Sequence, residues 1–261
     1  MGRNPVMVRQ IKRAVRASIL SYPKTFHARQ IAANGTKLHV RVGGTGPAVV
    51  LLHGYGETGD MWVPLAKDLE RDRTVIVPDL RGMGLSAKPA SGYDKKTQGH
   101  DVAGILDALK IERVALVTHD IGNMVGYAFA AQYRHRVTRF VLTDAPLPGV
   151  GPWEEILKNP LLWHFRFGGP DMERLVAGRE RIYLDRFWNE FSATPKRFSE
   201  TPAGTTRSST PALVRCMRVS RSLRRSTRTR RTTRLSSRPA SLMFRFWRWA
   251  GKNPLVRRWP R

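Results

Sequence analysis

Polar and apolar positions alternate near the start of the chain and then give way to short, continuous apolar runs. Residues 27–32 and 37–42 alternate on either side of Asn34-Gly35. This dipeptide is typical of a tight hairpin turn, because both residues adopt positive φ readily. Continuous apolar runs follow at 48–52, 74–77, 114–117 and 139–142. Their length and composition predict buried strands.

Amphipathic segments lie between these runs. The apolar residues from Val102 to Leu109 share one helical face, and residues 122–132 have the composition of a second helix. Buried strands that alternate with helices predict an α/β fold with a mostly parallel sheet. Such a sheet places its site in the loops after the carboxyl ends of the strands. In this sequence, segments rich in polar residues directly follow the predicted strands.

The composition changes twice in the second half of the chain. Residues 150–200 are rich in aromatic side chains, with helical spacing from Met172 to Phe191, which predicts a helical cap over the sheet. Residues 201–261 are dominated by Arg, Ser and Thr, which is typical of disorder. We therefore expect a basic, disordered leader over 1–26, an α/β core over 27–149, a partial cap over 150–200 and an aberrant tail over 201–261.

The positive charge lies at the two ends of the chain. The formal net charge is +26, yet residues 57–200 carry twenty basic and twenty acidic side chains. Residues 1–56 carry nine basic side chains, residues 201–261 carry 17, and neither segment contains an acid. A tail of this kind binds polyanions without sequence specificity. Since RRM-, KH- and zinc-type signatures are missing, we expect no specific nucleic-acid partner.

Cysteine content and hydropathy restrict cofactors and compartment. Cys216 is the single cysteine, so a disulfide within one chain and a cysteine metal cluster are both excluded. We expect no cofactor and no metal. No apolar run approaches the roughly 18 residues of a membrane-spanning helix. The Arg-rich N-terminus fits a disordered leader better than a targeting sequence, and we favour a cytoplasmic location.

Three motifs follow the predicted strands in order. They are His53-Gly54-Tyr55-Gly56, then Asp79-Leu80-Arg81-Gly82-Met83-Gly84, then Thr118-His119-Asp120-Ile121-Gly122. In order and spacing they resemble α/β-hydrolases of the epoxide hydrolase and dehalogenase branch, over about residues 27–200. The resemblance implies an α/β-hydrolase core with a helical cap. From the composition of residues 201–261 we expect that the C-terminal third of this fold is lost to a disordered basic tail.

The resemblance places Asp120 in the nucleophile elbow, a strained strand-to-helix turn that needs small neighbours such as Gly122. Thr118 departs from the family pattern, which usually has glycine there. An aspartate at the elbow attacks carbon in an epoxide or carbon–halogen bond and forms an alkyl ester, which water then hydrolyses. The expected enzyme is therefore a hydrolase that attacks carbon, and not a serine esterase.

The resemblance also assigns supporting roles. The backbone N–H groups of Tyr55 and Ile121 would form the oxyanion hole. Asp144, after the last predicted strand, is the expected acid of the triad. His164 in the cap is the expected proton donor to the epoxide oxygen, because ring opening creates an alkoxide; Tyr183 is a weaker candidate. The residues expected to shape the turns nearby are His53, Gly54, His119 and Gly122.

The neighbours of Asp120 weigh against two related activities. Haloalkane dehalogenases usually place tryptophan directly after the nucleophile, where this chain has Ile121. Fluoroacetate-type dehalogenases place arginine just after the aspartate, whereas Asn123 and Met124 carry no cation. Epoxide hydrolysis is favoured, with a small apolar molecule such as an epoxide as substrate. A haloalkane or haloacetate dehalogenase is the alternative.

The triad of the family needs a general-base histidine on a loop after the last strand of the sheet, and this chain has no histidine there. The seven histidines are at positions 27, 39, 53, 100, 119, 135 and 164, and after residue 142 only His164 follows. We therefore expect impaired turnover or none. When the codons of residues 243–251 are read in a shifted frame, they are compatible with the segment VPVLAVGGE, a buried strand with a glycine turn. We interpret the tail as frameshifted; the alternative is a non-catalytic, basic polyanion-binding protein.

Overall fold

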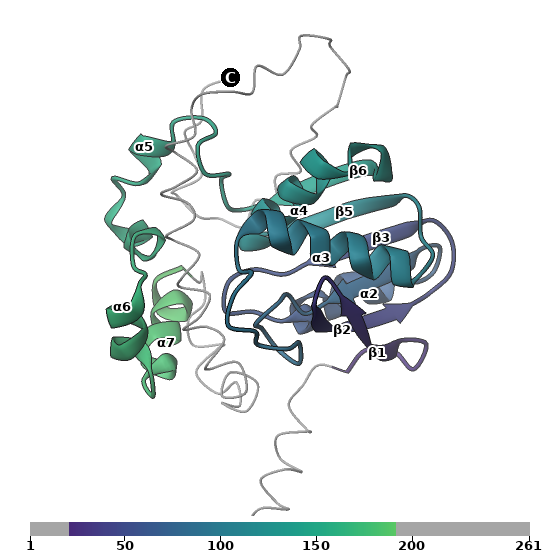
Figure 1. Ribbon diagram of the computed structural model, residues 1–261, viewed down its shortest axis with the longest axis horizontal. Helices are drawn as coiled ribbons and strands as arrows, with labels where there is room; N and C mark the ends of the chain where they lie inside the picture. The colour runs from purple at the N-terminus through teal and green to yellow at the C-terminus, as the bar shows by residue number, and fades with distance from the viewer. Residues whose placement is uncertain (1–20, 192–261) are drawn as a thin grey trace, which may run out of the picture.

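The computed structural model describes residues 21–191, so the segment 201–261 and most of the expected leader lie outside it. Figure 1 shows a sheet with helices on both faces and a separate group of helices to one side. The strands are β1 His27–Ala33, β2 Thr36–Gly43, β3 Ala48–Leu52, β4 Thr74–Pro78, β5 Val114–His119 and β6 Val137–Thr143. The core helices are η1 Gly59–Trp62, α2 Val63–Leu69, α3 Lys95–Ala108, α4 Ile121–Gln132 and η2 Arg134–Arg136.

The described strands form one sheet in the order β1-β2-β4-β3-β5-β6. β1 and β2 form the predicted antiparallel hairpin around Asn34-Gly35, and β2 is antiparallel to β4. The other neighbouring pairs are parallel. The α/β fold with a mostly parallel sheet is thus confirmed. Each predicted run lies within a strand, although β6 extends beyond residues 139–142 at both ends.

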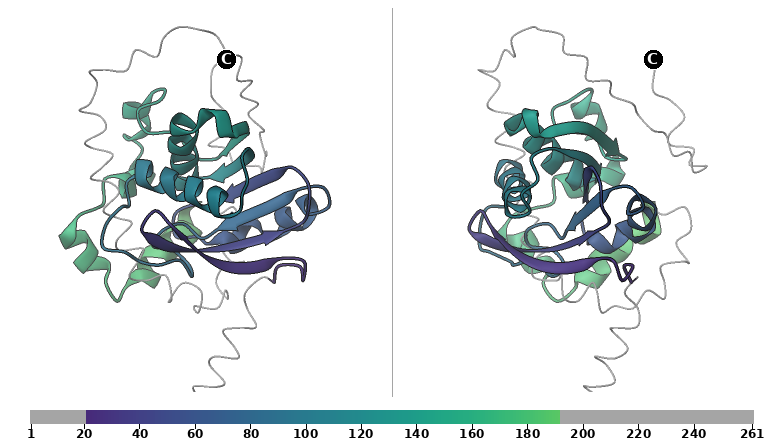
Figure 2. Two further views of the ribbon diagram at one scale, coloured as in Figure 1. Left: turned by 45° about the vertical axis from the view of Figure 1, so that its right-hand side comes forward. Right: turned by 90° about the vertical axis from the view of Figure 1, so that its right-hand side faces the viewer.

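Helices cover both faces of the sheet, which explains why the strands read as continuous apolar runs. Val50 and Leu52 of β3 point into the cluster that contains Val125 and Phe129 of α4. Their neighbours Val49 and Leu51 point to the other face, against Trp62 and Ala66. Side chains alternate between faces along a strand, so both faces need apolar residues. Figure 2 shows α3 and α4 side by side over one face.

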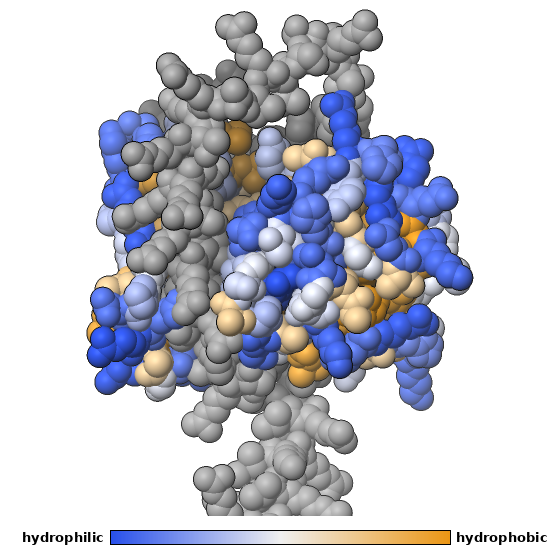
Figure 3. Space-filling model, viewed as in Figure 1, coloured by the Kyte–Doolittle hydropathy of each residue, from blue (hydrophilic) through white to orange (hydrophobic). Residues whose placement is uncertain are grey.

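The outer surface of this layer is polar. Figure 3 shows a largely hydrophilic face over α3, with apolar colour gathered beside β1 and β2. No helix within residues 21–191 is long and apolar enough to cross a membrane. The last part of the expected leader is described, and there the Tyr22 hydroxyl donates to the Gly59 carbonyl at 2.5 Å.

The cap is helical, as expected, but its helices are short. Its elements are α5 Trp153–Ile156, η3 Pro160–Phe165, α6 Pro170–Val176 and α7 Glu180–Phe191. The helical spacing from Met172 to Phe191 is interrupted between α6 and α7, where Gly178 has a φ of +80°. Buried Val176, Tyr183 and Leu184 pack with Tyr55, which lies in the loop after β3. The cap therefore contacts the core at the carboxyl end of a central strand.

Candidate active site

Asp120 stands at the turn between β5 and α4, with a φ of 49° and a ψ of −119°. A positive φ is uncommon for a residue other than glycine and stores strain, which functional sites often do. The turn leaves no room beside it. A Cβ on Gly122 would lie 2.5 Å from the Leu52 carbonyl oxygen and 2.8 Å from that of His53. The expected strand-to-helix elbow is thus present at this position.

Backbone amides hold the Asp120 carboxylate. Its Oδ1 accepts the Tyr55 N–H at 2.9 Å, and the Ile121 amide is a second donor to the same carboxylate. Burial raises the pKa of Asp120, while these two hydrogen bonds and the charge of His119 oppose the rise. The two amides assigned to the oxyanion hole from the sequence therefore converge on the side chain that they are expected to serve.

His119 lies between two carboxylates beside the elbow. Its Nδ1 is 3.0 Å from Oε2 of Glu57, and its Nε2 is 3.4 Å from Oδ2 of Asp144. Burial alone would lower the pKa of His119, but the hydrogen bonds to Asp144 and Glu57 outweigh it and raise the pKa to about 10. The hydrogen bond from His119 in turn lowers the pKa of Asp144. His119 is therefore an imidazolium at neutral pH.

Glu57 is a site residue that the sequence interpretation missed. Its Oε2 accepts the Gly54 N–H at 2.7 Å as well as pairing with His119. Gly54 must be small here, since a Cβ would lie 2.5 Å from Glu57 Oε2 and 2.7 Å from His119 Nδ1. Its position in the sequence could have indicated this role, because Glu57 directly follows the His53–Gly56 motif and lies at the same sheet edge as Asp120.

His53 has a structural role. Its ring is fully buried, Nδ1 donates to the Gly54 carbonyl, and Nε2 accepts the Leu80 N–H at 2.9 Å. Burial lowers the pKa of His53, which fits a neutral ring with one donor and one acceptor. The ring thereby connects the loops after β3 and β4.

A network of buried hydrogen bonds connects the elbow to the end of β6. Thr118, at the usual glycine position, donates to Asn123 Oδ1 at 2.7 Å. Asn123 Nδ2 donates to the carbonyls of Thr143 and Ala145 at 2.9 and 2.8 Å. Asn123 is completely buried and fixes the segment that carries Asp144. The departure at Thr118 is therefore accommodated, and it adds a tie between β5, α4 and the end of β6.

The predicted cap residues lie in an aromatic cluster. The His164 ring is 5.0 Å from that of Phe187, and Phe187 is 5.8 Å from Tyr55. Tyr183 meets Tyr55 edge to face at 6.4 Å. Burial and the nearby Arg186 lower the pKa of His164 to about 4, against the opposing effect of the Leu161 carbonyl. His164 and Tyr183 are thus linked through rings to the loop whose amide holds Asp120.

All seven histidines of the sequence lie within residues 21–191. In this part of the chain, no histidine side chain forms a hydrogen bond to Asp120. His119 is adjacent, but both of its ring nitrogens face carboxylates. The structure therefore brings Asp120, Asp144 and the two amides together around the elbow without bringing a histidine into the position of a general base.

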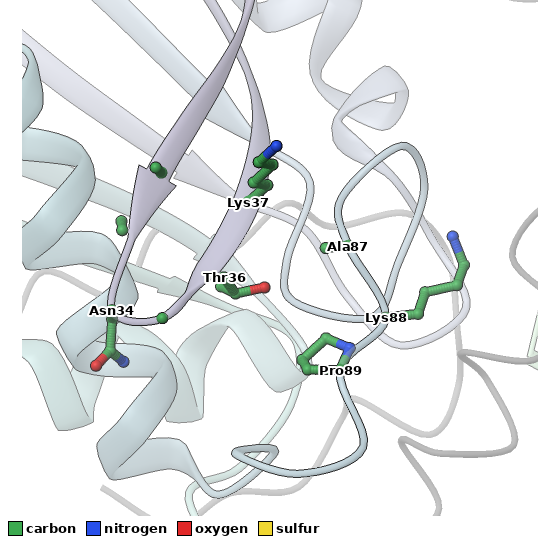
Figure 4. A pocket seen from close by; sticks show the side chains of 9 residues that line it. Asn34, Thr36, Lys37, Ala87, Lys88 and Pro89 are labelled. Carbon is green, nitrogen blue, oxygen red and sulfur yellow. The ribbon is translucent and has the colours of Figure 1, made fainter.

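A separate pocket lies on another part of the surface. Its volume is about 720 Å³, and it is bounded by the β1–β2 turn and the loop at Ala87–Pro89. Figure 4 shows Lys37 and Lys88 at its rim, with their side chains pointing in different directions. None of the residues around Asp120 lines this pocket, so it is not part of the candidate active site.

Comparisons with known proteins agree with this geometry. The family described as alpha/beta hydrolase fold matches residues 47–215. A soluble epoxide hydrolase from Corynebacterium sp. (strain C12) is 33% identical over 179 residues, 66% of this chain and 62% of that protein. A fluoroacetate dehalogenase from Burkholderia sp. is 31% identical over 149 residues, 54% of this chain and 49% of that protein. The chain therefore spans less than two thirds of the length of either relative.

A solved structure is similar as well. The epoxide hydrolase CorEH is 29% identical, with a TM-score of 0.65, over 77% of this chain and 75% of that one.

Proposed function

This chain belongs to the α/β hydrolase fold family, and from that premise we propose that it is an epoxide hydrolase-like enzyme with Asp120 as the nucleophile. Its relatives include epoxide hydrolases and related hydrolases, so it is a hydrolase by family. The single observation that carries the proposal is the Asp120 carboxylate at a strained elbow, with Oδ1 held at 2.9 Å by the Tyr55 amide.

This arrangement divides the two carboxylate oxygens by role. The Tyr55 amide holds Oδ1, which leaves Oδ2 to attack a carbon of the epoxide ring. The new bond joins Oδ2 to carbon while the ring C–O bond breaks, and its electron pair moves to the epoxide oxygen. In the resulting ester, Oδ1 is the carbonyl oxygen. Water attack would place negative charge on that oxygen, and the amides of Tyr55 and Ile121 are the proposed donors that would stabilise it.

The alkoxide that leaves carbon needs a proton. We propose His164 as the donor, with Tyr183 as the weaker candidate. The low pKa of His164 keeps the ring neutral at pH 7. The one N–H of the neutral ring would turn from the Leu161 carbonyl to the alkoxide and give it the proton, and the ring would regain a proton from water. Because the ring is linked to Tyr55 through Phe187, the donor lies on the side of the cap that contacts the loop of the proposed oxyanion hole.

The second half of the reaction lacks a base in this chain. We propose Asp144 as the inherited triad acid, but its partner here is His119, whose pKa of about 10 prevents it from accepting a proton at neutral pH. The alkyl ester should therefore form and persist. We attribute the loss to a shifted reading frame after about residue 200, outside the described residues, and the nucleotide sequence at that point tests this attribution.

The experiment is modification of Asp120 by styrene oxide, followed by intact mass and peptide mapping. We expect a mass increase of one epoxide per chain on the Asp120 peptide, and no such adduct in Asp120→Ala. Asp171→Ala, which removes an exposed carboxylate, is the matched control and should react as wild type. Rapid multiple turnover of the epoxide by the Asp120→Ala variant would contradict a mechanism in which Asp120 is the nucleophile. Faster modification by chloroacetate than by the epoxide would favour a dehalogenase.

A further inference from the structure

The cap contains a buried cation that the proposed reaction does not use. Arg186 of α7 is only 12% exposed. The guanidinium carbon lies 4.5 Å from the ring centre of Trp163 and 5.4 Å from those of Phe187 and Phe191. Aromatic faces attract a cation but do not replace the hydrogen bonds that water would give it. The remaining N–H donors of Arg186 therefore need acceptors.

The donors of Arg186 can be followed one by one. Nη2 donates to the Leu161 carbonyl at 2.5 Å, and Nε pairs with Glu190 Oε2 at 2.9 Å. Nη1 is buried and has no hydrogen-bond partner within residues 21–191. A buried donor without a partner is unfavourable. An acceptor that binds at Nη1 would remove that cost.

A purely structural role explains only part of this arrangement. The contacts with Leu161 and Glu190 tie α7 to η3 and to its own last turn, and they would suffice for packing. They leave Nη1 unexplained. An apolar side chain of similar length could pack against the same three rings without a buried, unpaired donor. The unused donor therefore points to a ligand.

The position of Arg186 connects it to the reacting groups. Its charge acts on His164, the proposed proton donor, and the His164 ring is 5.0 Å from Phe187. Phe187 packs on Tyr55, whose amide holds Asp120. A group bound at Nη1 of Arg186 thus lies on the same side of the cap as His164, the proposed proton donor.

We propose that Arg186 binds the carboxylate of the substrate, so that the enzyme prefers an epoxide that carries a carboxylate group over a neutral epoxide. A guanidinium forms short, charge-assisted hydrogen bonds with carboxylates, and the surrounding aromatic rings exclude the water that would weaken them. The inference rests on the proposed function, in that Asp120 still attacks the ring. It narrows the expected substrate from an apolar epoxide to an epoxy acid.

The test compares 3-phenyloxirane-2-carboxylate with its primary amide, which has nearly the same size and no charge. We expect wild type to form the Asp120 adduct faster with the acid, on the order of tenfold. Arg186→Met should lose this preference, and Arg186→Lys should keep part of it. Arg174→Met, which removes an exposed cation of α6 that is 84% exposed, should keep it fully. Equal rates for acid and amide in wild type, or a preference that survives Arg186→Met, would overturn the proposal.

Calorimetric titration with benzoate and benzamide separates this inference from the proposed function. Arg186-dependent binding of benzoate, weaker in Arg186→Met and unchanged in Arg174→Met, would support the carboxylate site even if no epoxide modified Asp120. Asp120 modification by both epoxides, with benzoate binding unaffected by Arg186→Met, would reject the carboxylate site and retain the nucleophile. The titration of wild type alone is informative if Arg186→Met does not fold: benzamide binding as tightly as benzoate would contradict the proposal.

Discussion

His119 and Glu57 form an ion pair beside Asp120, the proposed nucleophile, with 3.0 Å between Nδ1 and Oε2. The pair joins the loop after β3 to the elbow, and Asp144 engages the other ring nitrogen from the end of β6. A ring that donates from both nitrogens carries a proton on each. His119 is therefore adjacent to the proposed nucleophile but is not available as a base, and its positive charge favours the ionised form of Asp120.

The pH dependence of this pair is testable by NMR. The folded pKa of His119, about 10, is raised above the ordinary value of 6.5, so its stabilising contribution is complete below about pH 6.5 and is lost as the pH rises through about 10. Glu57→Gln should lower the pKa and weaken this dependence, whereas Glu154→Gln, an exposed acid of α5, should change neither. Titration of the His119 ring near pH 6.5 in wild type would contradict the ion pair.

His164 should behave in the opposite way. Its folded pKa of about 4 lies below 6.5, so the unfolded chain binds the proton first, and stability is lost as the pH falls from about 6.5 toward 4. The chemical shifts of the His164 ring should stay constant between pH 6 and 8. His164→Phe should slow formation of the Asp120 adduct by about a hundredfold, as expected for loss of a proton donor. An unchanged rate would exclude His164 from that role.

Gly122 tests the geometry of the elbow. In an ordinary helix, alanine is favoured over glycine, but here the added Cβ would meet the Leu52 carbonyl oxygen at 2.5 Å. Gly122→Ala should lower the free energy of unfolding by about 2 kcal/mol, as overpacking against backbone does. Tyr127→Ala, at a 48% exposed position of the same helix, is the control with little expected change. Denaturant unfolding measures both, and a stabilised Gly122→Ala would show that the turn is not so tight.

Asn123 tests the network under the elbow. Asn123→Ala leaves the carbonyls of Thr143 and Ala145 without their donor and the Thr118 hydroxyl without one acceptor. Buried groups left unpaired cost about 1–3 kcal/mol each, so the free energy of unfolding should fall by about 3 kcal/mol. Asn189→Ala, at an exposed position of α7, should have little effect. A loss below about 1 kcal/mol would mean that water replaces the amide.

The sequence was sufficient for the core because local pattern and tertiary burial agree there. Strands buried on both faces are continuous apolar runs, and β3 coincides with the predicted run 48–52. The Asn34-Gly35 turn lies between β1 and β2 as predicted. The cap was less predictable: helical spacing does not reveal the break at Gly178, since a glycine is tolerated within a helical pattern.

The site was predictable only in part, for a physical reason. Asp120 is marked by its small neighbours and by its place directly after a buried run. The ion pair between Glu57 and His119 joins residues 62 positions apart, and it exists because two strand ends meet at one edge of the sheet. Arg186 and Asn123 likewise acquire their roles from contacts with distant segments. Such contacts leave no periodic signal in the sequence.

The most direct test of the central claim is the lifetime of the Asp120 adduct. Wild type is treated with excess styrene oxide, the reagent is removed, and the intact mass is followed over hours. We expect one adduct per chain that persists, less than one equivalent of diol released, and no adduct at this site in Asp120→Ala. Sustained diol production well beyond one equivalent per chain, with no adduct on Asp120, would contradict the assignment of Asp120 as a nucleophile that lacks a base.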